Sequence, residues 1–367
     1  MKYFFPVYIC LALCCLLLPA SMQSQTGSSS SVVQSVGLKK GLFETDEVLH
    51  IKISGNIREV MNDRGENPQY HPFTLSWSGA DSSEISMPVR IKTRGHFRKD
   101  RANCTYPPLL INFAKKDLTP SSLFKGQDKL KLVVPCKSDE YVIREWLVYK
   151  LYNLVTPNSF RARLVWVVMN DTVKKKQTSF YCFLLEDEEE MAKRNDVVII
   201  KRRMLNAQNT ERTAFLNMAV FEYMIGNTDW SVPYQHNIRL IAKDSTGLAT
   251  TVPYDFDHSG MVSAPYANPP EQLEMSSVTE RRYRGYCIPD MNAFKPAIAL
   301  FNELKKDFYS VYTNCSLLNA KYVKTATKYL DEFYATINNP KTLQAEFGYP
   351  CKIGGSGNVI IKGLGTD

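Results

Sequence analysis

The chain has 367 residues, of which 44% are apolar and 22% are charged, and its formal net charge is +8. These proportions are typical of a globular protein and exclude general disorder, and the length allows one two-lobed domain or two small ones. The positive charge favours anionic ligands, but the sequence holds no arginine-rich tract and no zinc-knuckle spacing, so we expect no nucleic-acid partner.

The first residues have the pattern of an export signal. Lys2 precedes an uncharged apolar run at residues 8–18, and small residues follow it, which predicts a signal peptide over residues 1–22. The run is shorter than the roughly 20 residues that a membrane span needs, so we expect no integral span after cleavage; an uncleaved anchor is the alternative. Residues 23–38 are rich in Ser and read as a flexible tether.

The cysteines fit an exported chain. Six of the nine lie beyond the signal, an even number that permits disulfides. Cys104 and Cys136 both lie beside predicted strands in the N-terminal half, and we expect them to pair; the spacing does not determine the other pairs. These six contain no C-x-x-C motif, so we expect no metal cluster.

Strands dominate the first half of the chain. Alternating apolar residues and turn signals predict antiparallel strands, with one helix at residues 139–155 that Ser138 or Asp139 caps and Pro157 ends. An acidic run at residues 186–190 marks either a lobe boundary or the start of a helix. The predicted strands lie at residues 47–53, 73–78, 87–94, 108–113, 129–134, 163–169 and 179–185.

Helices dominate the second half. Helical apolar spacing predicts helices at residues 212–225, 294–311 and 317–337. Between the first two lies a hairpin, with strands at residues 238–242 and 251–254. The expected class is therefore α+β, with a sheet-rich N-lobe at residues 39–187 and a helix-rich C-lobe at residues 188–367.

The hairpin carries the strongest chemical signal. Asp229 follows Gly226 at the end of a helix, on a loop suited to orienting a hydroxyl nucleophile; capping the next turn is its alternative role. The open end of the hairpin brings Asn237 beside Asp255, and Mg²⁺ accepts one or two carboxylates together with phosphate and water. Asp257 is the alternative metal ligand. A calcium or turn-stabilising acidic loop is the competing interpretation.

Phosphate binding would have to rely on side chains, because the sequence has neither a G-x-G-x-x-G nor a Walker A motif. The candidate cations are Arg94, which precedes a Gly at a strand end, Lys131 on a strand, and Arg144 on the first long helix. Each is otherwise a solvated surface cation. Glu186 binds either the helix cation or the nucleotide, or it simply begins an acidic helix.

The order of these motifs resembles a known family. GNTDW, HN and PYDFD follow KLKLVVPC, IREWL and a strand that ends in RG, and the match spans residues 89–260. In this order the motifs resemble the spore coat protein H (CotH-like) family of atypical kinases, and most closely its exported members in Bacteroidetes-type bacteria. The resemblance implies a two-lobed atypical protein-kinase-like fold. It also implies Asp229 as the catalytic residue and Asp255 or Asp257 as the metal ligand.

The resemblance also sets the expected function. We expect an exported kinase of the bacterial periplasm or cell surface that transfers phosphate from ATP to Ser or Thr hydroxyls of a protein, with Mg²⁺ or Mn²⁺ as the cation. The alternative is a catalytically inactive binding module that keeps the kinase fold. A metal-dependent hydrolase is less well supported, because no nucleophile–base pair is visible in the sequence.

Overall fold

A computed structural model describes residues 41–352 apart from residues 80–81, 115–117 and 119–121. The predicted signal peptide (1–22) and tether (23–38) lie outside the described residues. The described residues belong to one compact unit. Within the described residues, no helix combines the length and the apolar character needed to cross a membrane.

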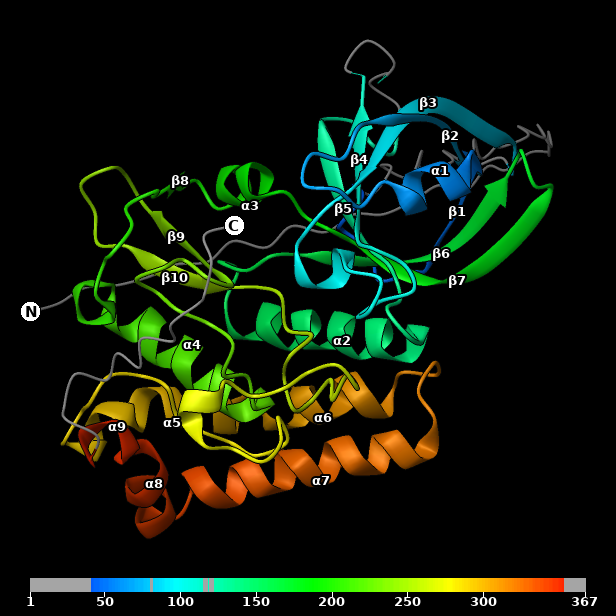
Figure 1. Cartoon of the computed structure of the whole chain (residues 1–367). Helices are drawn as coiled ribbons and strands as arrows, with labels where there is room; N and C mark the ends of the chain where they lie inside the picture. Colours follow the sequence, from blue (N-terminus) through cyan, green and yellow to red (C-terminus); the bar gives the residue numbers. More distant parts are fainter. Residues whose placement is uncertain (1–40, 80–81, 115–117, 119–121, 353–367) are drawn as a thin grey trace, which may run out of the picture. The chain divides into compact units, whose positions relative to one another are not determined.

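The first half of the described chain is a closed barrel (Figure 1). Its seven strands follow the order β1-β2-β3-β4-β5-β7-β6, and β1 closes the ring by pairing in parallel with β6. All other neighbours are antiparallel. The strands are β1 (Leu49–Gly55), β2 (His71–Ser78), β3 (Glu84–Thr93), β4 (Leu109–Phe113), β5 (Lys129–Val133), β6 (Ala162–Asp171) and β7 (Lys176–Leu185).

The closed barrel corrects the predicted fold. The sequence predicts a two-lobed atypical protein-kinase-like fold with a sheet-rich N-lobe. That prediction is wrong, because the seven strands form a closed ring and not the open sheet of a kinase N-lobe. The positions of all seven strands were predicted. Their closure was not, because it depends on β1 pairing with a strand more than 100 residues later, and side-chain alternation carries no information about pairing partners. Closure leaves no strand edge of the ring unpaired.

Helix α2 (Asp139–Val155) connects the barrel to the helical region (Figure 1). The side chain of Ser138 accepts a hydrogen bond from the backbone of Glu140, and two acidic residues occupy the first turn, as expected at a helix N-terminus. The helix contacts β6 and β7 on one side and α4 and α6 on the other. It is therefore buried along most of its circumference rather than on one stripe.

The second half of the chain is largely helical. Helix α4 (Arg212–Ile225) has the bounds that were predicted, whereas the helix predicted at residues 294–311 is divided at Leu304. A three-stranded sheet, β10-β9-β8, packs beside α4. The remaining elements are α1 (Ile57–Asn62), α3 (Glu188–Arg194), β8 (Val198–Ile199), β9 (Ile238–Ala242), β10 (Thr250–Pro253), α5 (Lys295–Glu303), α6 (Lys305–Thr313), α7 (Ala320–Ile337), α8 (Pro340–Phe347), α9 (Tyr349–Lys352) and short 3₁₀ turns.

Two disulfides stabilise the chain. Cys104 pairs with Cys136, which confirms the prediction, and Cys287 pairs with Cys351, which the sequence did not indicate. Disulfides form and persist in oxidising compartments. The pairs are therefore consistent with an exported protein.

Candidate functional site

Asp229 lies on a short loop that begins where α4 ends. Gly226 closes the helix in the left-handed region (φ 69°), and a Cβ at this position would lie 2.1 Å from the Tyr329 hydroxyl, so a larger residue has no room here. The side chain of Asn227 then accepts a hydrogen bond from the backbone of Asp229 (3.1 Å). The loop leaves the Asp229 side chain 23% exposed, so that a ligand can reach it.

Both carboxylate oxygens of Asp229 have partners. Oδ1 lies 3.1 Å from His236 Nε2, and Oδ2 accepts a hydrogen bond of 3.1 Å from the amide of Asn237. The same amide donates to the backbone oxygen of Asp229 at 2.7 Å. Burial alone would raise the pKa of Asp229, but the hydrogen bond and charge of His236, with His258 and Arg284, lower it below its ordinary value. Asp229 is therefore held ionised and in a defined orientation.

Arg284 supports this loop through hydrogen bonds to its backbone, and no sequence pattern predicts this role. The buried guanidinium donates from Nη1 to the backbone oxygens of Thr228 and Trp230, which flank Asp229 on both sides (2.8 Å to Trp230). Burial lowers the pKa of Arg284 to about 10, so it remains charged at neutral pH. One cation thus fixes the backbone on either side of Asp229 and favours its ionised form.

The β9–β10 hairpin brings Asn237 and Asp255 to its open end. The backbone N–H of Tyr254 donates to the backbone oxygen of Asn237 (3.0 Å), which extends the ladder by one pair beyond Ile238 and Pro253. Asn237 and Asp255 both have positive φ, at 52° and 63°. This conformation is uncommon for residues other than Gly, although Asn and Asp adopt it more readily than most, and such residues concentrate at functional sites.

Asp255 lies within a cluster of charged groups. Burial and the neighbouring Asp257 raise its pKa above the ordinary value, and the cations around it oppose the rise. The Asp255 carboxylate receives no hydrogen bond from the described residues, although its backbone N–H donates to Tyr149 Oη at 2.9 Å. The cations are Arg94, Arg98 and Lys131. A buried carboxylate among cations, with its oxygens uncommitted, is suited to a ligand that carries charge of its own.

Glu145 on α2 is the third acidic residue of the cluster and was not predicted. It is 2% exposed, and burial, followed by Asp257 and Asp255, raises its pKa well above the ordinary value. It lies one helical turn before Tyr149, on a face of α2 that is otherwise apolar or aromatic. A charged residue on an otherwise apolar helical face is the signal in the sequence that points to Glu145.

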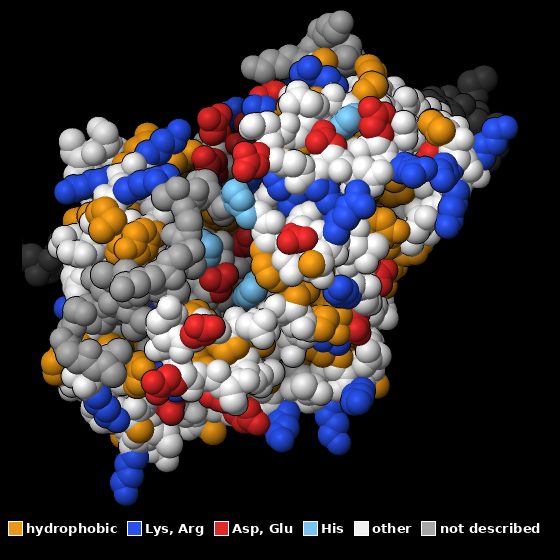
Figure 2. Space-filling view, viewed as in Figure 1, with side chains coloured by type: hydrophobic (Ala, Val, Ile, Leu, Met, Phe, Trp, Pro, Cys, Tyr) orange, Lys and Arg blue, Asp and Glu red, His pale blue; other side chains and the backbone are white. Residues whose placement is uncertain are grey.

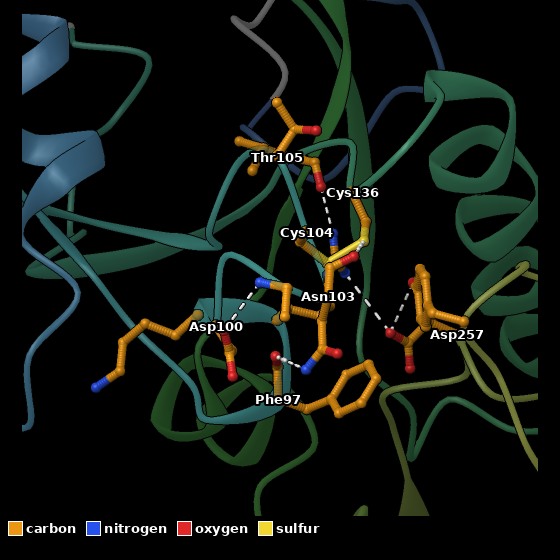
Figure 3. The surroundings of a disulfide bond; sticks show 12 residues. Phe97, Asp100, Asn103, Cys104, Thr105, Cys136 and Asp257 are labelled. Carbon is orange, nitrogen blue, oxygen red and sulfur yellow. Dashed lines mark hydrogen bonds and ion pairs between the residues drawn. A yellow bond between two sulfur atoms is a disulfide. The ribbon is translucent and has the colours of Figure 1, made fainter.

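Asp257 is more fully neutralised than Asp255. Its Oδ2 accepts a hydrogen bond from the Tyr266 hydroxyl at 2.9 Å and lies 3.7 Å from Arg98 Nη1. Figure 3 shows the Cys104–Cys136 disulfide at the end of the loop that contributes this ion pair, with Asp257 on the neighbouring segment. Arg98 also donates to the backbone oxygen of Val134, near the second cysteine. The disulfide thus holds the Arg98 loop in place against the acidic pair.

Lys131 lies between this cluster and a pocket. Burial, then Arg94 and Arg239, lower the pKa of Lys131 to about 8, although Asp255 and Glu188 favour its charged form. The pocket has a volume of about 410 Å³. Its lining combines Leu110 and Leu185 with three cations and five carboxylates: Lys129, Lys131, Arg239, Asp128, Asp187, Glu188, Glu189 and Glu190. Because carboxylates outnumber cations in this lining, an anionic group is best accommodated at its Lys131 end, next to Arg94.

Two of the predicted binding residues lie elsewhere. The guanidinium of Arg144 donates to Val262 O and Glu140 and stacks 3.9 Å from the centre of the Tyr322 ring, in the helical region. Glu186 accepts hydrogen bonds of 2.9 Å from both Nε and Nη2 of Arg194 and another from the backbone of Arg161. The structure therefore brings together Asp229, Asn237, Asp255, Asp257, Arg94 and Lys131 but not Arg144 or Glu186.

Charged side chains gather on the face of the molecule that Figure 2 shows. Histidine and acidic side chains lie near the line where the barrel meets the helical region, with Lys and Arg side chains on the barrel side of them. The open end of the β9–β10 hairpin links an ionised carboxylate (Asp229) to an uncommitted carboxylate (Asp255) and the cations around it. Such a set can orient a hydroxyl and neutralise a polyanion.

The donor set fits some metals and not others. No group of three or more His, Cys, Asp or Glu side chains within the described part of the chain is placed to hold one metal ion, which disfavours zinc, since it takes three or four such ligands. Mg²⁺ requires only one or two carboxylates and completes its shell with phosphate and water. Asp255 and the side-chain oxygen of Asn237 satisfy that requirement.

Comparison with known proteins adds no further assignment. No protein-family model matches the chain, and a search of curated proteins finds no significant match.

Proposed function

We propose that the chain is an exported phosphotransferase that moves phosphate from ATP to Ser or Thr hydroxyls of a protein, with Mg²⁺ or Mn²⁺. The observation that carries the proposal is the open end of the β9–β10 hairpin, where Asn237 is hydrogen-bonded to Asp229 and adjoins Asp255. The proposal rests on this site and on the resemblance of its motifs to the CotH-like family, and not on the kinase fold. The two disulfides support a location in the bacterial periplasm or at the cell surface.

Each group has a role that its surroundings support. Asp229, ionised and held by His236 and Asn237, orients the acceptor hydroxyl and accepts its proton. Asp255 and Asn237 would hold the cation, which when bound supplies positive charge to the phosphates. Lys131, at the edge of the pocket, contacts the phosphates of the nucleotide.

Asp257 has a different role from Asp255. Its carboxylate is engaged by Tyr266 and Arg98, which makes it a weaker candidate for the cation. It instead positions Arg98 at the cluster. Of the two aspartates that the sequence leaves open as the metal ligand, the proposal therefore takes Asp255.

Transfer of labelled phosphate tests the proposal. Asp229→Asn should lower the rate of transfer at least about 100-fold, the contribution typical of a general base. Asp255→Asn should abolish the transfer that requires Mg²⁺, because it removes a ligand of the cation. Asp307→Asn, an exposed acid on α6, is the matched control and should transfer like the wild type. Transfer at the wild-type rate by both site variants would contradict the proposal.

Nucleotide binding distinguishes the main competitor, a non-catalytic binding module. A ligand present at about 100 times its dissociation constant adds about 2.7 kcal/mol to the stability of the folded state. We expect ATP with Mg²⁺ to raise the melting temperature, and a chelator to remove the increase. A stabilised protein without any transfer would indicate a binding module instead.

A further inference from the structure

A basic surface segment lies outside the site described above. Residues 201–204 read Lys-Arg-Arg-Met, and all four side chains are exposed. Lys201, Arg202 and Arg203 form no ion pair with any other residue of the described ranges. Three adjacent cations without acidic partners attract an anionic ligand.

This basic loop is attached to the turn that carries the candidate catalytic residue. The backbone N–H of Met204 donates to the Pro233 backbone oxygen at 2.7 Å, and the Gln235 side chain donates to the Arg202 backbone oxygen at 2.9 Å. Pro233 and Gln235 belong to the turn between Ser231 and His236, whose backbones are paired in both directions (2.9 and 3.0 Å). The same turn leads directly from Asp229 to Asn237. The backbone that carries the three cations is therefore held against the turn that connects Asp229 to Asn237.

The loop is also held in a defined conformation. Met204 has a positive φ of 58°, which is uncommon for such a residue, and its side chain is 65% exposed. At the other end, the backbone N–H of Ile200 donates to Leu240 O in β9 at 2.7 Å. A loop fixed at both ends presents its cations and one exposed apolar side chain with little loss of conformational freedom on binding.

We propose that the basic loop 201–204 recognises acidic residues that flank the acceptor hydroxyl, so that the protein acts on acidic segments of its protein substrate. The inference rests on the proposed function, because it places the acceptor hydroxyl at Asp229. A polypeptide with its hydroxyl at that position continues over the neighbouring surface at about 3.3–3.6 Å per residue. Acidic side chains a few residues from the hydroxyl then reach the cations.

A second basic triplet in the chain provides a matched control. Lys174, Lys175 and Lys176, at the turn between β6 and β7, are also exposed, and the turn has no bond to the Asp229 loop. Replacing these three lysines removes the same charge as replacing the cations of the basic loop. Any effect of net charge alone is therefore common to both triple variants.

The experiment compares two short peptides that carry one Ser, flanked by Glu in one and by Gln in the other. Wild-type protein should transfer phosphate to the Glu peptide with the higher kcat/KM. In K201Q/R202Q/R203Q, we expect kcat/KM for the Glu peptide to fall about ten-fold because KM rises, as the loss of several exposed ion pairs implies. The kcat/KM for the Gln peptide should not change. K174Q/K175Q/K176Q should behave like the wild type.

A binding measurement separates this inference from the proposed function. The same peptides with Ala in place of Ser are labelled, and their binding is followed by fluorescence anisotropy, which requires no catalysis. Stronger binding of the Glu peptide, lost in K201Q/R202Q/R203Q and kept in the control triple, supports the basic loop even if no phosphate is transferred. Equal binding of the Glu and Gln peptides by the wild type, or equal losses in both triple variants, overturns the inference.

Discussion

The charge of Lys131 depends on pH just above neutrality. Burial disfavours its charged ammonium form most strongly, followed by the neighbouring cations Arg94 and Arg239. The carboxylates of Asp255 and Glu188 favour the charged form. The balance lowers its pKa from the ordinary value to about 8. An anionic phosphate brought beside Lys131 favours the protonated form, so proton binding and nucleotide binding reinforce each other.

This balance predicts the pH dependence of nucleotide binding. In the free protein, Lys131 is charged below about pH 8 and loses its proton above it, so the affinity for ATP should fall by up to about ten-fold between about pH 8 and pH 9. Calorimetric titration with ATP and Mg²⁺ at several pH values measures the change. Lys131→Arg remains charged over this range and should flatten the profile.

A control separates Lys131 from the general charge of the chain. Lys174→Arg, at the exposed β6–β7 turn, should keep the wild-type dependence on pH. A flat profile for the wild type, or an unchanged slope in Lys131→Arg, would assign the phosphate contact to another cation.

At the scale of elements, a covalent link controls how one loop meets the site. The loop after β3 carries Arg98 to Asp257, and Cys104 at its end is bonded to Cys136 just after β5. The backbone N–H of Thr105 donates to the Cys136 oxygen at 3.1 Å, so the disulfide and a hydrogen bond fix the same end of the loop. The other disulfide, Cys287–Cys351, links segments of the helical half.

The two disulfides should therefore differ in their effect on the site. In the chain-entropy account, a loop of 32 residues gives about 3–4 kcal/mol of stability and one of 64 residues about 4 kcal/mol. Replacing either pair by Ala should lower the melting temperature by a similar amount. We expect only C104A/C136A to weaken ATP binding and phosphate transfer by folded protein, because only it frees Arg98.

The measurement is made well below both melting temperatures, with calorimetry and labelled phosphate as readouts. C287A/C351A serves as the control for the loss of a covalent link. Equal losses of binding in the two variants would show that general stability, and not the position of Arg98, connects the disulfides to the site.

Local signals explain which elements the sequence predicted well. The bounds of α2 and α4 were predicted because residues such as Ser138, Pro157 and Gly226 begin or end helices through their own backbone preferences. The helix predicted at residues 294–311 is divided at Leu304, where no Pro or Gly indicates a break. The two halves contact different neighbours, α5 contacting α4 and α6 contacting α2 and α7, and such tertiary contacts are not visible in a local pattern.

The same distinction applies to the site. Asn237 and Asp255 were predicted to meet because a single hairpin joins them. Glu145, Arg98 and Arg284 reach the site from separate elements. A charged residue on an apolar helical face marks Glu145 as buried, but no local pattern places any of the three at this site. Their contributions follow from the packing of α2 and of two long loops.

At the scale of the whole molecule, the barrel and the helical region share strands. The apolar interior forms two clusters, one inside the barrel and one among the helices. Along β6 and β7 the side chains alternate between them: Val165 and Leu184 belong to the barrel interior, whereas Leu164 and Phe183 pack with α2 and the helices. Alternation in the sequence predicts these strands but does not show that each face meets a different cluster.

Shared strands predict that the two regions unfold together. Loss of the barrel removes the wall on which α2 packs, and loss of α2 exposes the outer faces of β6 and β7. Leu75 inside the barrel and Leu330 on α7 are both fully buried and belong to different clusters. Replacing either residue by Ala should lower the free energy of unfolding by about 2–5 kcal/mol. We expect this loss to destabilise the barrel and the helical region equally, because they unfold together.

Native-state hydrogen exchange at increasing denaturant concentration tests this prediction. Leu75→Ala should reduce the protection of the most stable amides of α7 as much as that of the barrel strands, and Leu330→Ala should reduce protection in the barrel as much as in α7. The two variants control for each other, because both replace a fully buried Leu by Ala. If each variant reduced protection only in its own region, the barrel and the helices would be independent folding units. The two regions could then separate at the site without complete unfolding.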